Sequence, residues 1–367
     1  MQKSRINREA LLDPVLLKVD AFTPLSRTPW AGTFIGERIK DRLCPQMRGK
    51  PIGEAWELSC DPAFPSRLQS DETPLLDLIQ AYPRETLSPE LHERSNGRME
   101  LMIKLLNAAE PLSLQVHPAD GDPDLKVGEC GKPESWLVID RDPGAGVYIG
   151  FSRSMSVDEL RDHLERGSLK AEHLQFVPVA PGDFFEIEPG VPHAIGAGVT
   201  LLEPQRILPG VSGKTYRLWD WGRRYDVEGR PDQNGRGRPL DIESSLRIVN
   251  PERQVGAAFV DKVRRRGERV LLGNQGQVTV YPANPYYQVR WFETRPVDGL
   301  TLSVKAGFGA ITVLSGELTM TGSGGRELRA PRGQSMFVPA TAFPLHVHSA
   351  EAAVWALTLP SGATLSL

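Results

Sequence analysis

The sequence predicts a mainly β protein built from jelly-roll-like units, with a helical insertion in the first part of the chain. Its 367 residues include 35 glycines and 31 prolines, an excess that indicates many turns and therefore short strands. Short β-branched or aromatic runs recur along the chain, each bounded by Gly, Pro or Asp. Helical periodicity is restricted to two segments, near 74–100 and 156–175.

The expected elements divide the chain into two units, 1–239 and 240–367. Ser156 is a candidate N-cap for the second helical segment, and Gly167 is expected to break that segment into two helices. Residues 226–239, rich in glycine, proline and charge, are typical of an exposed linker or long loop. The expected strands are 112–117, 134–139, 146–151, 183–187 and 199–203 in the first unit, and 268–272, 277–281, 286–292, 300–305, 309–314, 316–320, 335–338 and 353–359 in the second.

The composition excludes several broad classes of protein. With 40% hydrophobic and 24% charged residues, the chain can bury a core, which excludes global disorder. A net charge of −3 without a basic stripe argues against a nucleic-acid partner, and basic residues such as Arg238 are expected to be solvated. We expect neither a membrane span nor a secretory signal. The widely spaced Cys44, Cys60 and Cys130 are expected to be reduced thiols of a cytoplasmic protein.

One polar face is expected on the strand at 112–117 (LSLQVH). Side chains alternate along a strand, so Ser113, Gln115 and His117 share one face and apolar residues occupy the other. The polar face either meets solvent or lines a polar cavity. Taken alone, the pattern favours solvent.

Charged residues also stand at two other strand boundaries. Lys132 and Glu134 flank Pro133, and taken alone this stretch is typical of an ordinary charged turn before a strand. Arg217 lies between two aromatic-rich runs that follow the stretch containing Glu203. Its planar guanidinium is suited equally to binding an anion and to a surface ion pair.

Residues 181–193 (PGDFFEIEPGVPH) contain a more specific pattern. A Gly-Asp turn opens a short strand, and a Pro-Gly-x-Pro turn closes it just before His193. A lone histidine in a strand is more often structural than a metal ligand. This stretch, however, resembles the second motif of the cupin superfamily, in which a glycine opens a strand and a histidine eleven residues later binds metal. Gly182 and His193 have that spacing.

Taken together, the stretches QVHP, GKPE, PHAIGAG, LLEPQ and TYRLWDWGR resemble the class I mannose-6-phosphate isomerases, which are zinc-dependent cupins. The similarity covers roughly residues 100–225, with a weaker match in 30–60. It implies a cupin (double-stranded β-helix) catalytic domain at 1–239 and a cupin-like β-sandwich at 240–367. The resemblance also implies one Zn²⁺ per chain, bound by Gln115, His117, Glu134 and His193. Zinc accepts imidazole nitrogen and amide or carboxylate oxygen.

The resemblance further implies an aldose–ketose isomerase that interconverts mannose 6-phosphate and fructose 6-phosphate through a cis-enediol. Lys132 and Arg217 would be cations of the sugar-phosphate pocket, Ser113 a phosphate contact and Glu203 an acid deep in the pocket. The candidate catalytic residues are therefore Arg217, Lys132 and Glu203, and the candidate substrate-binding residues are Ser113, Lys132 and Arg217. Lys132, Glu203 and a metal-bound water are alternatives for the base that moves the proton between C1 and C2.

Some alternatives stay open at this point. Segment 206–214 is longer than in the bacterial members, so it can reshape the substrate entrance and supply Arg206 and Lys214 as extra cations. A different or unphosphorylated sugar is one alternative, and a non-catalytic sugar-binding cupin is another. In the second unit, His346 and His348 have no upstream partner set, so we expect no metal there. The sequence does not distinguish a monomer from a homodimer.

Overall fold

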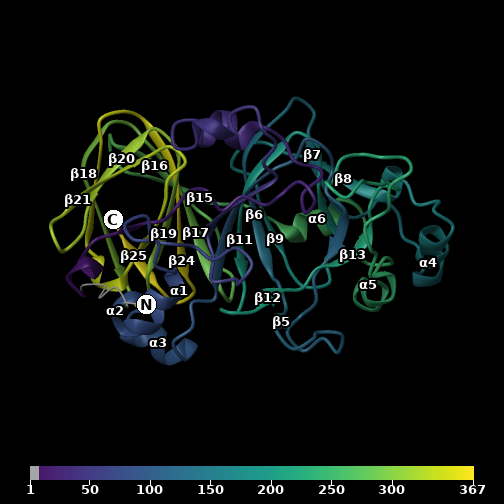
Figure 1. Ribbon diagram of the computed structural model, residues 1–367, viewed down its shortest axis with the longest axis horizontal. Helices are drawn as coiled ribbons and strands as arrows, with labels where there is room; N and C mark the ends of the chain where they lie inside the picture. Colours follow the sequence, from purple (N-terminus) through teal and green to yellow (C-terminus); the bar gives the residue numbers. More distant parts are fainter. Residues whose placement is uncertain (1–7) are drawn as a thin grey trace.

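The computed structural model describes residues 8–367 and shows two β bodies side by side (Figure 1). The body formed by the C-terminal strands is green to yellow, and the body formed by the central strands is teal. The mainly β, cupin-like prediction is confirmed. No described helix has the length and hydropathy that crossing a membrane requires.

Two antiparallel sheets form the first body. The five-stranded sheet has the order β13 (Tyr216–Trp219), β4 (Leu114–Val116), β10 (His193–Ile195), β7 (Gly146–Phe151) and β8 (Leu174–Pro178). The six-stranded sheet has the order β14 (Arg264–Arg265), β9 (Phe184–Ile187), β6 (Glu134–Arg141), β11 (Val199–Arg206), β3 (Leu101–Asn107) and β2 (Glu54–Leu58). A parallel pair, β5 (Glu129–Cys130) and β12 (Ser212–Gly213), lies outside these sheets.

Two more sheets form the second body. The seven-stranded sheet has the order β1 (Val15–Leu16), β22 (Ser335–Val338), β19 (Gly309–Ser315), β24 (Ala353–Pro360), β17 (Tyr287–Thr294), β16 (Gly276–Val280) and β15 (Glu268–Leu271). The five-stranded sheet has the order β21 (Glu327–Pro331), β20 (Glu317–Thr321), β23 (Leu345–Ser349), β18 (Val297–Lys305) and β25 (Thr364–Ser366). Because β1 pairs with β22, the seven-stranded sheet contains both early and late parts of the chain.

Six α-helices are present in the described residues: α1 (Leu75–Ala81), α2 (Pro83–Leu87), α3 (Pro89–Ser95), α4 (Val157–Glu165), α5 (Ile242–Ile248) and α6 (Gly256–Val263). Ser156 caps α4 as predicted, since its side chain accepts a hydrogen bond from the Glu159 N–H. The helical prediction for 156–175 extends too far. After Gly167 the chain makes only one 3₁₀ turn, and Leu174 already begins β8. Helices α5 and α6 were not predicted. The short 3₁₀ or π turns are Arg8–Leu12, Ile35–Ile39, Pro45–Met47, Ala171–His173 and Ala340–Ala342.

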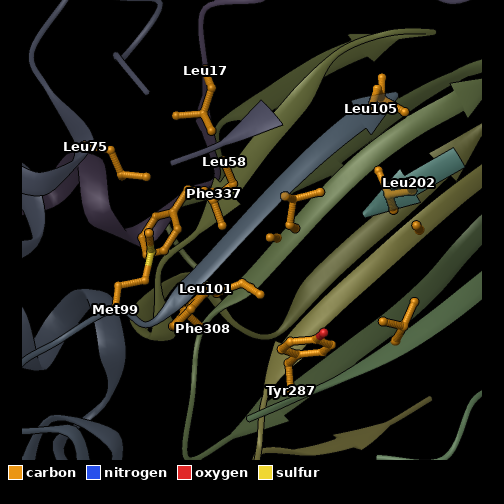
Figure 2. Packing of buried hydrophobic residues seen from close by; sticks show 14 of the residues in the cluster. Leu17, Leu58, Leu75, Met99, Leu101, Leu105, Leu202, Tyr287, Phe308 and Phe337 are labelled. Carbon is orange, nitrogen blue, oxygen red and sulfur yellow. The ribbon is translucent and has the colours of Figure 1, made fainter. Parts of the chain in front are cut away.

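The six-stranded sheet is buried on both faces. Its outer face packs against the seven-stranded sheet of the second body, in one apolar cluster that includes Leu101 and Leu202 of the first body and Phe308 and Phe337 of the second (Figure 2). Its inner face packs against the five-stranded sheet of the first body, through residues such as Trp136. This burial removes apolar surface from water on both sides of the sheet.

Tyr287 of β17, in the second body, forms hydrogen bonds with the six-stranded sheet of the first body. Its hydroxyl donates to the carbonyl oxygen of Pro204 over 2.8 Å and lies 3.0 Å from Ser135 Oγ. Ser135 and Pro204 lie on the outer face of their strands, so residues 134 and 136 of β6 and 203 and 205 of β11 point inward. The second body thus fixes the backbone that presents the inward side chains.

Candidate metal centre and its pocket

The interior of the first body is polar at one end, where Ser113, Gln115 and His117 of the segment around β4 point inward. Of the two alternatives for this face, the polar cavity is observed, and the solvent face that the pattern alone favoured is wrong, because Ser113 and His117 are each 0% exposed. Leu114 and Val116, on the opposite face of the strand, pack with the apolar residues of α4 and α5. These helices cover the outer face of the sheet, so the polar face lines the interior.

Strand register brings the four predicted metal ligands to this end. His193 on β10 and Arg217 on β13 both lie opposite Gln115 on β4, one on each side. In the facing sheet, Glu134 on β6 lies opposite Gln205 on β11. Side chains from strands far apart in the sequence therefore converge between the two sheets.

His117, Glu134 and His193 form a compact cluster, with ligand atoms that all lie within 4.8 Å of one another. His117 Nε2 is 3.2 Å from Glu134 Oε2, and His193 Nε2 is 3.5 Å from Glu134 Oε1. Both nitrogens are buried and neither has a hydrogen-bond partner, which is costly unless another group satisfies them. His193 Nδ1 lies 2.8 Å from the Val191 carbonyl oxygen, a contact that orients the ring. The three side chains fit a divalent metal ion.

Electrostatics hold this cluster in the protonation state that metal binding requires. Burial lowers the pKa of both histidines, that of His117 to about 3, and the nearby charge of Lys132 acts in the same direction. Burial opposes ionisation of Glu134, but the charge of Lys132 and the contact with His117 outweigh it and hold the pKa of Glu134 well below its ordinary value. Two neutral imidazoles and one carboxylate result.

Gln115 links this cluster to the predicted substrate-binding residues. Its amide nitrogen donates to Ser113 Oγ over 3.1 Å, which leaves the amide oxygen to act as an acceptor or a ligand. Ser113 Oγ also accepts from Arg217 Nε over 3.2 Å. The hydroxyl of Ser113 is therefore the common partner of the amide and the guanidinium.

Gln205 and Trp136 hold the two buried carboxylates, a role that the sequence analysis missed. Gln205 Nε2 donates to Glu134 Oε2 over 2.8 Å and to Glu203 Oε2 over 2.6 Å. Trp136 Nε1 lies 3.2 Å from Glu134 Oε1 and 3.1 Å from Glu203 Oε1. The signal for Gln205 was its position two residues after Glu203, which places both side chains on one face of β11.

A pocket of about 300 Å³ opens beside the cluster, lined in part by Gln115, Lys132, Glu203 and Arg217. Lys132 Nζ lies 3.2 Å from Glu134 Oε2, so the pocket and the cluster are in direct contact. Burial and the charge of Glu134 raise the pKa of Glu203 to about 8, although Lys104 and Lys132 oppose this shift. Burial opposes the charge of Lys132, but Glu134 and Glu203 outweigh it and raise the pKa of Lys132.

Lys104 is a further buried cation of the pocket that the sequence analysis missed. Its Nζ lies 3.8 Å from Glu54 Oε2, 4.0 Å from Glu203 Oε2 and 4.3 Å from the centre of the Trp56 ring. The signal was a single lysine within the apolar strand 101–107. Since an unpaired buried charge is expensive, such a lysine implies carboxylate partners.

Arg238 also lines the pocket, contrary to the prediction that it is solvated, and its side chain is only 14% exposed. It lies at the end of the loop 226–239, most of which is exposed as predicted. Burial and the charge of Arg238 lower the pKa of Arg217, although Asp220 opposes this shift. The loop therefore contributes a cation to the site.

The segment 206–214 does not supply the extra pocket cations that were predicted. Arg206 is paired with Asp120 at 2.7 Å and with Glu100 at 3.2 Å. Lys214 is paired with Glu129 at 3.2 Å. Carboxylates outside the pocket lining therefore hold both cations. The residues of this segment that line the pocket are Ile207, Ser212 and Gly213.

Comparisons with known proteins show which family this chain resembles. Residues 32–134 match the family described as phosphomannose isomerase type I, catalytic domain. The mannose-6-phosphate isomerase of Streptococcus mutans is 32% identical over 280 residues, which cover 76% of this chain and 83% of that protein. The mannose-6-phosphate isomerase ManA of Bacillus subtilis is 37% identical over 236 residues, 61% of this chain and 66% of that protein.

The fold is also similar to solved structures. The crystal structure of the mannose 6-phosphate isomerase from Bacillus subtilis superimposes with a TM-score of 0.72 at 21% identity. The match covers 94% of this chain and 99% of that one, so it includes both β bodies. From the sequence identity and coverage of its relatives, we conclude that the chain belongs to the type I phosphomannose isomerase family.

Proposed function

We propose that this protein is a metal-dependent aldose–ketose isomerase that interconverts mannose 6-phosphate and fructose 6-phosphate. The observation that carries the proposal is the contact between the cluster of His117, Glu134 and His193 and the pocket. The lining of that pocket includes the cations Lys132 and Arg217 and the buried acid Glu203. The names of the sequence relatives support the choice of substrate.

Zinc is the metal we propose, held by His117, Glu134 and His193 with Gln115 as the fourth ligand. This donor set suits Zn²⁺, which accepts imidazole nitrogen together with oxygen ligands. The bound ion would act as a Lewis acid toward a substrate oxygen. Gln205 and Trp136 would assist metal binding, because their hydrogen bonds orient the Glu134 carboxylate.

The substrate-binding residues we propose are Ser113, Lys132 and Arg217. Among the described residues, Arg217 has no carboxylate within ion-pair distance, and its side chain donates to Ser113 Oγ and to the Pro239 carbonyl oxygen. Its charge is therefore available to an anionic ligand. Because guanidinium groups match phosphate and enediolate oxygens in geometry, Arg217 is suited to both binding and charge stabilisation.

Proton transfer is assigned to Glu203 and Lys132. In the direction from aldose to ketose, Glu203 would remove the proton from C2 while O1 gains a proton, which gives the cis-enediol. Glu203 would then return a proton to C1 as O2 loses one. A pKa of about 8 lets Glu203 take up and release a proton near neutral pH. Lys132, which its raised pKa keeps as a cation, would stabilise the charge that develops on the oxygens, give O1 its proton and take back the proton that O2 loses.

The proposal is tested by following mannose 6-phosphate isomerisation in zinc-loaded, chelator-treated and zinc-restored protein. We expect turnover that disappears with the chelator and returns with zinc. Bound metal without turnover would refute the proposed substrate and direct the search to other sugars. Turnover that survives complete removal of the metal would refute the metal dependence.

Two broader expectations also belong to the proposal. We propose a catalytic domain at 1–239 and a metal-free domain at 240–367, although β1 adds to a sheet of the second body and β14 adds to a sheet of the first. We propose the cytoplasm as the location, supported by three buried cysteines that form no disulfide.

A further inference from the structure

Arg217 and Arg238 are two arginines of one pocket whose charges act on each other. Both line the 300 Å³ pocket, although Arg217 precedes the loop 226–239 and Arg238 lies at its end. Among the described residues, Asp220 is the carboxylate within ion-pair distance of Arg238, and Arg217 has none. Two half-buried guanidinium groups that line one pocket repel each other unless an anion lies near both.

The hydrogen bonds of Arg238 leave part of its guanidinium unused. Its Nε donates to Asp220 Oδ2 and its Nη2 to Asp220 Oδ1, each over 2.7 Å. No hydrogen-bond acceptor for Nη1 is found among residues 8–367. Asp220, 5% exposed, also accepts from Arg223 Nη2 over 2.7 Å, and Arg223 pairs with Glu110 at 3.2 Å as well. Within this cluster, two carboxylates therefore face the three arginines Arg217, Arg223 and Arg238. Asp220 thus positions Arg238 without neutralising the positive charge of the cluster.

The backbone ties Arg238 to Arg217. Arg217 Nη1 donates to the Pro239 carbonyl oxygen over 3.0 Å, next to Arg238 in the chain. The backbone of Arg217 also exchanges two hydrogen bonds with Asp241: its N–H donates to Asp241 Oδ2 over 3.0 Å, and its carbonyl oxygen accepts from the Asp241 N–H over 2.8 Å. The end of the loop and β13 therefore hold the two arginines as one unit.

From this arrangement we infer that Arg238 is a second phosphate-binding arginine of the pocket, acting together with Arg217. The inference rests on the proposed sugar-phosphate substrate. A phosphate dianion satisfies both guanidinium groups and removes their mutual repulsion, which a neutral sugar cannot do. The loop 226–239 is then part of the substrate site, with Asp220 as the residue that positions Arg238.

The test compares Arg238→Gln and Arg238→Lys with the unchanged zinc-loaded enzyme. Inorganic phosphate binding is measured by calorimetry at constant ionic strength, and KM and kcat are measured with mannose 6-phosphate. We expect Arg238→Gln to weaken phosphate binding and raise KM by about 10- to 100-fold, the usual contribution of hydrogen bonds to charged groups. The metal content stays unchanged, and kcat falls by less than KM rises. Arg238→Lys keeps the positive charge, so its phosphate affinity and KM are expected to lie between those of Arg238→Gln and those of the unchanged enzyme.

Arg230→Gln is the matched control, because Arg230 belongs to the same loop, is 66% exposed and pairs with Asp226 and Glu228 outside the pocket. It is expected to bind phosphate like the unchanged protein. Equal phosphate affinity in Arg238→Gln and Arg230→Gln overturns the inference, as does absence of phosphate binding by the unchanged protein. If Arg238→Gln does not fold, Arg238→Lys decides. Lysine cannot reproduce the two hydrogen bonds to Asp220 that position the guanidinium, so unchanged phosphate affinity in Arg238→Lys also overturns the inference. Phosphate binding that depends on Arg238, without turnover of mannose 6-phosphate, refutes the proposed isomerase and leaves this inference intact.

Discussion

The two β bodies contain a similar turn and strand but place the histidine differently. In the first, the turn at Gly182 has a φ of +88° and the strand that follows leads to His193, which is 2% exposed and faces the interior. In the second, Gly333 has a φ of +86°, yet His346 is exposed on the outer face of β23, where its Nδ1 lies 3.0 Å from Thr301 Oγ1. A positive φ favours glycine at both turns.

The interiors of the two bodies explain this difference. The space between the sheets of the second body is filled with apolar side chains, among them Phe292 and Trp355, whose rings stack at 3.8 Å. In the first body, one end of the corresponding space is occupied by the buried polar side chains of Glu134, Glu203, His117 and His193. The same type of β fold can therefore enclose either an apolar core or a polar site, depending on which residues of its strands point inward.

The largest expected effect separates the two bodies directly. His193→Ala should remove a metal ligand and lower zinc affinity and turnover by at least about 100-fold, more than the loss of a residue that only orients a ligand. His346→Ala should leave both unchanged, since the His346 side chain is exposed. Metal analysis and an isomerase assay on the two variants check this. Equal losses would mean that the metal site is not in the first body.

Gln205→Leu tests the polar interior of the first body. Without the Gln205 amide, Glu134 and Glu203 lose a shared donor, so we expect zinc affinity to fall by about 10- to 100-fold. Competition with a chelator of known affinity measures it. The matched control is Gln277→Leu in the second body, where the glutamine contacts exposed Glu293. A control as impaired as Gln205→Leu would contradict the assignment.

Tyr287→Phe tests whether the second body supports the site. The change removes the hydroxyl that contacts Ser135 and donates to Pro204, so we expect the free energy of unfolding to fall by about 1–3 kcal/mol. Urea unfolding measures this loss. Tyr286→Phe, in which the neighbouring tyrosine is 40% exposed, serves as the control and should change stability little. Identical stability of the two variants would show that the Tyr287 hydroxyl contributes nothing.

The smallest effect concerns the thiols, which all lie in the first 130 residues. Burial raises the pKa of Cys60 to about 12, and it also raises the pKa of Cys44 and Cys130. At pH 8 the protonated thiol predominates, because the pH lies below the raised pKa, and little of the reactive thiolate is present. The thiols are also buried and therefore shielded from the reagent. Labelling with a thiol reagent should be slow in the native protein and fast in denaturant. Rapid labelling of the native protein would contradict the burial of these residues.

Local patterns in the sequence were sufficient for many strands, whereas the metal-ligand candidates came from the resemblance of several stretches, taken together, to a known family. The strand at 146–151 is observed with those same boundaries, because alternation and turn residues act over a few positions. His117, Glu134 and His193 were inferred from that resemblance, and the structure brings them together. Patterns at this scale did not predict helices α5 and α6.

The β class, the spacing from Gly182 to His193 and the residue types able to bind a metal were predictable from the amino-acid sequence, since these depend on local turn and strand geometry. Only the tertiary structure decided that Ser113 and His117 face inward, because this depends on helices that cover the opposite face of the sheet. It also decided that Arg238 reaches the pocket. Long-range packing sets which segments meet, and no pattern of neighbouring residues records that Asp220 holds a side chain from the end of a loop.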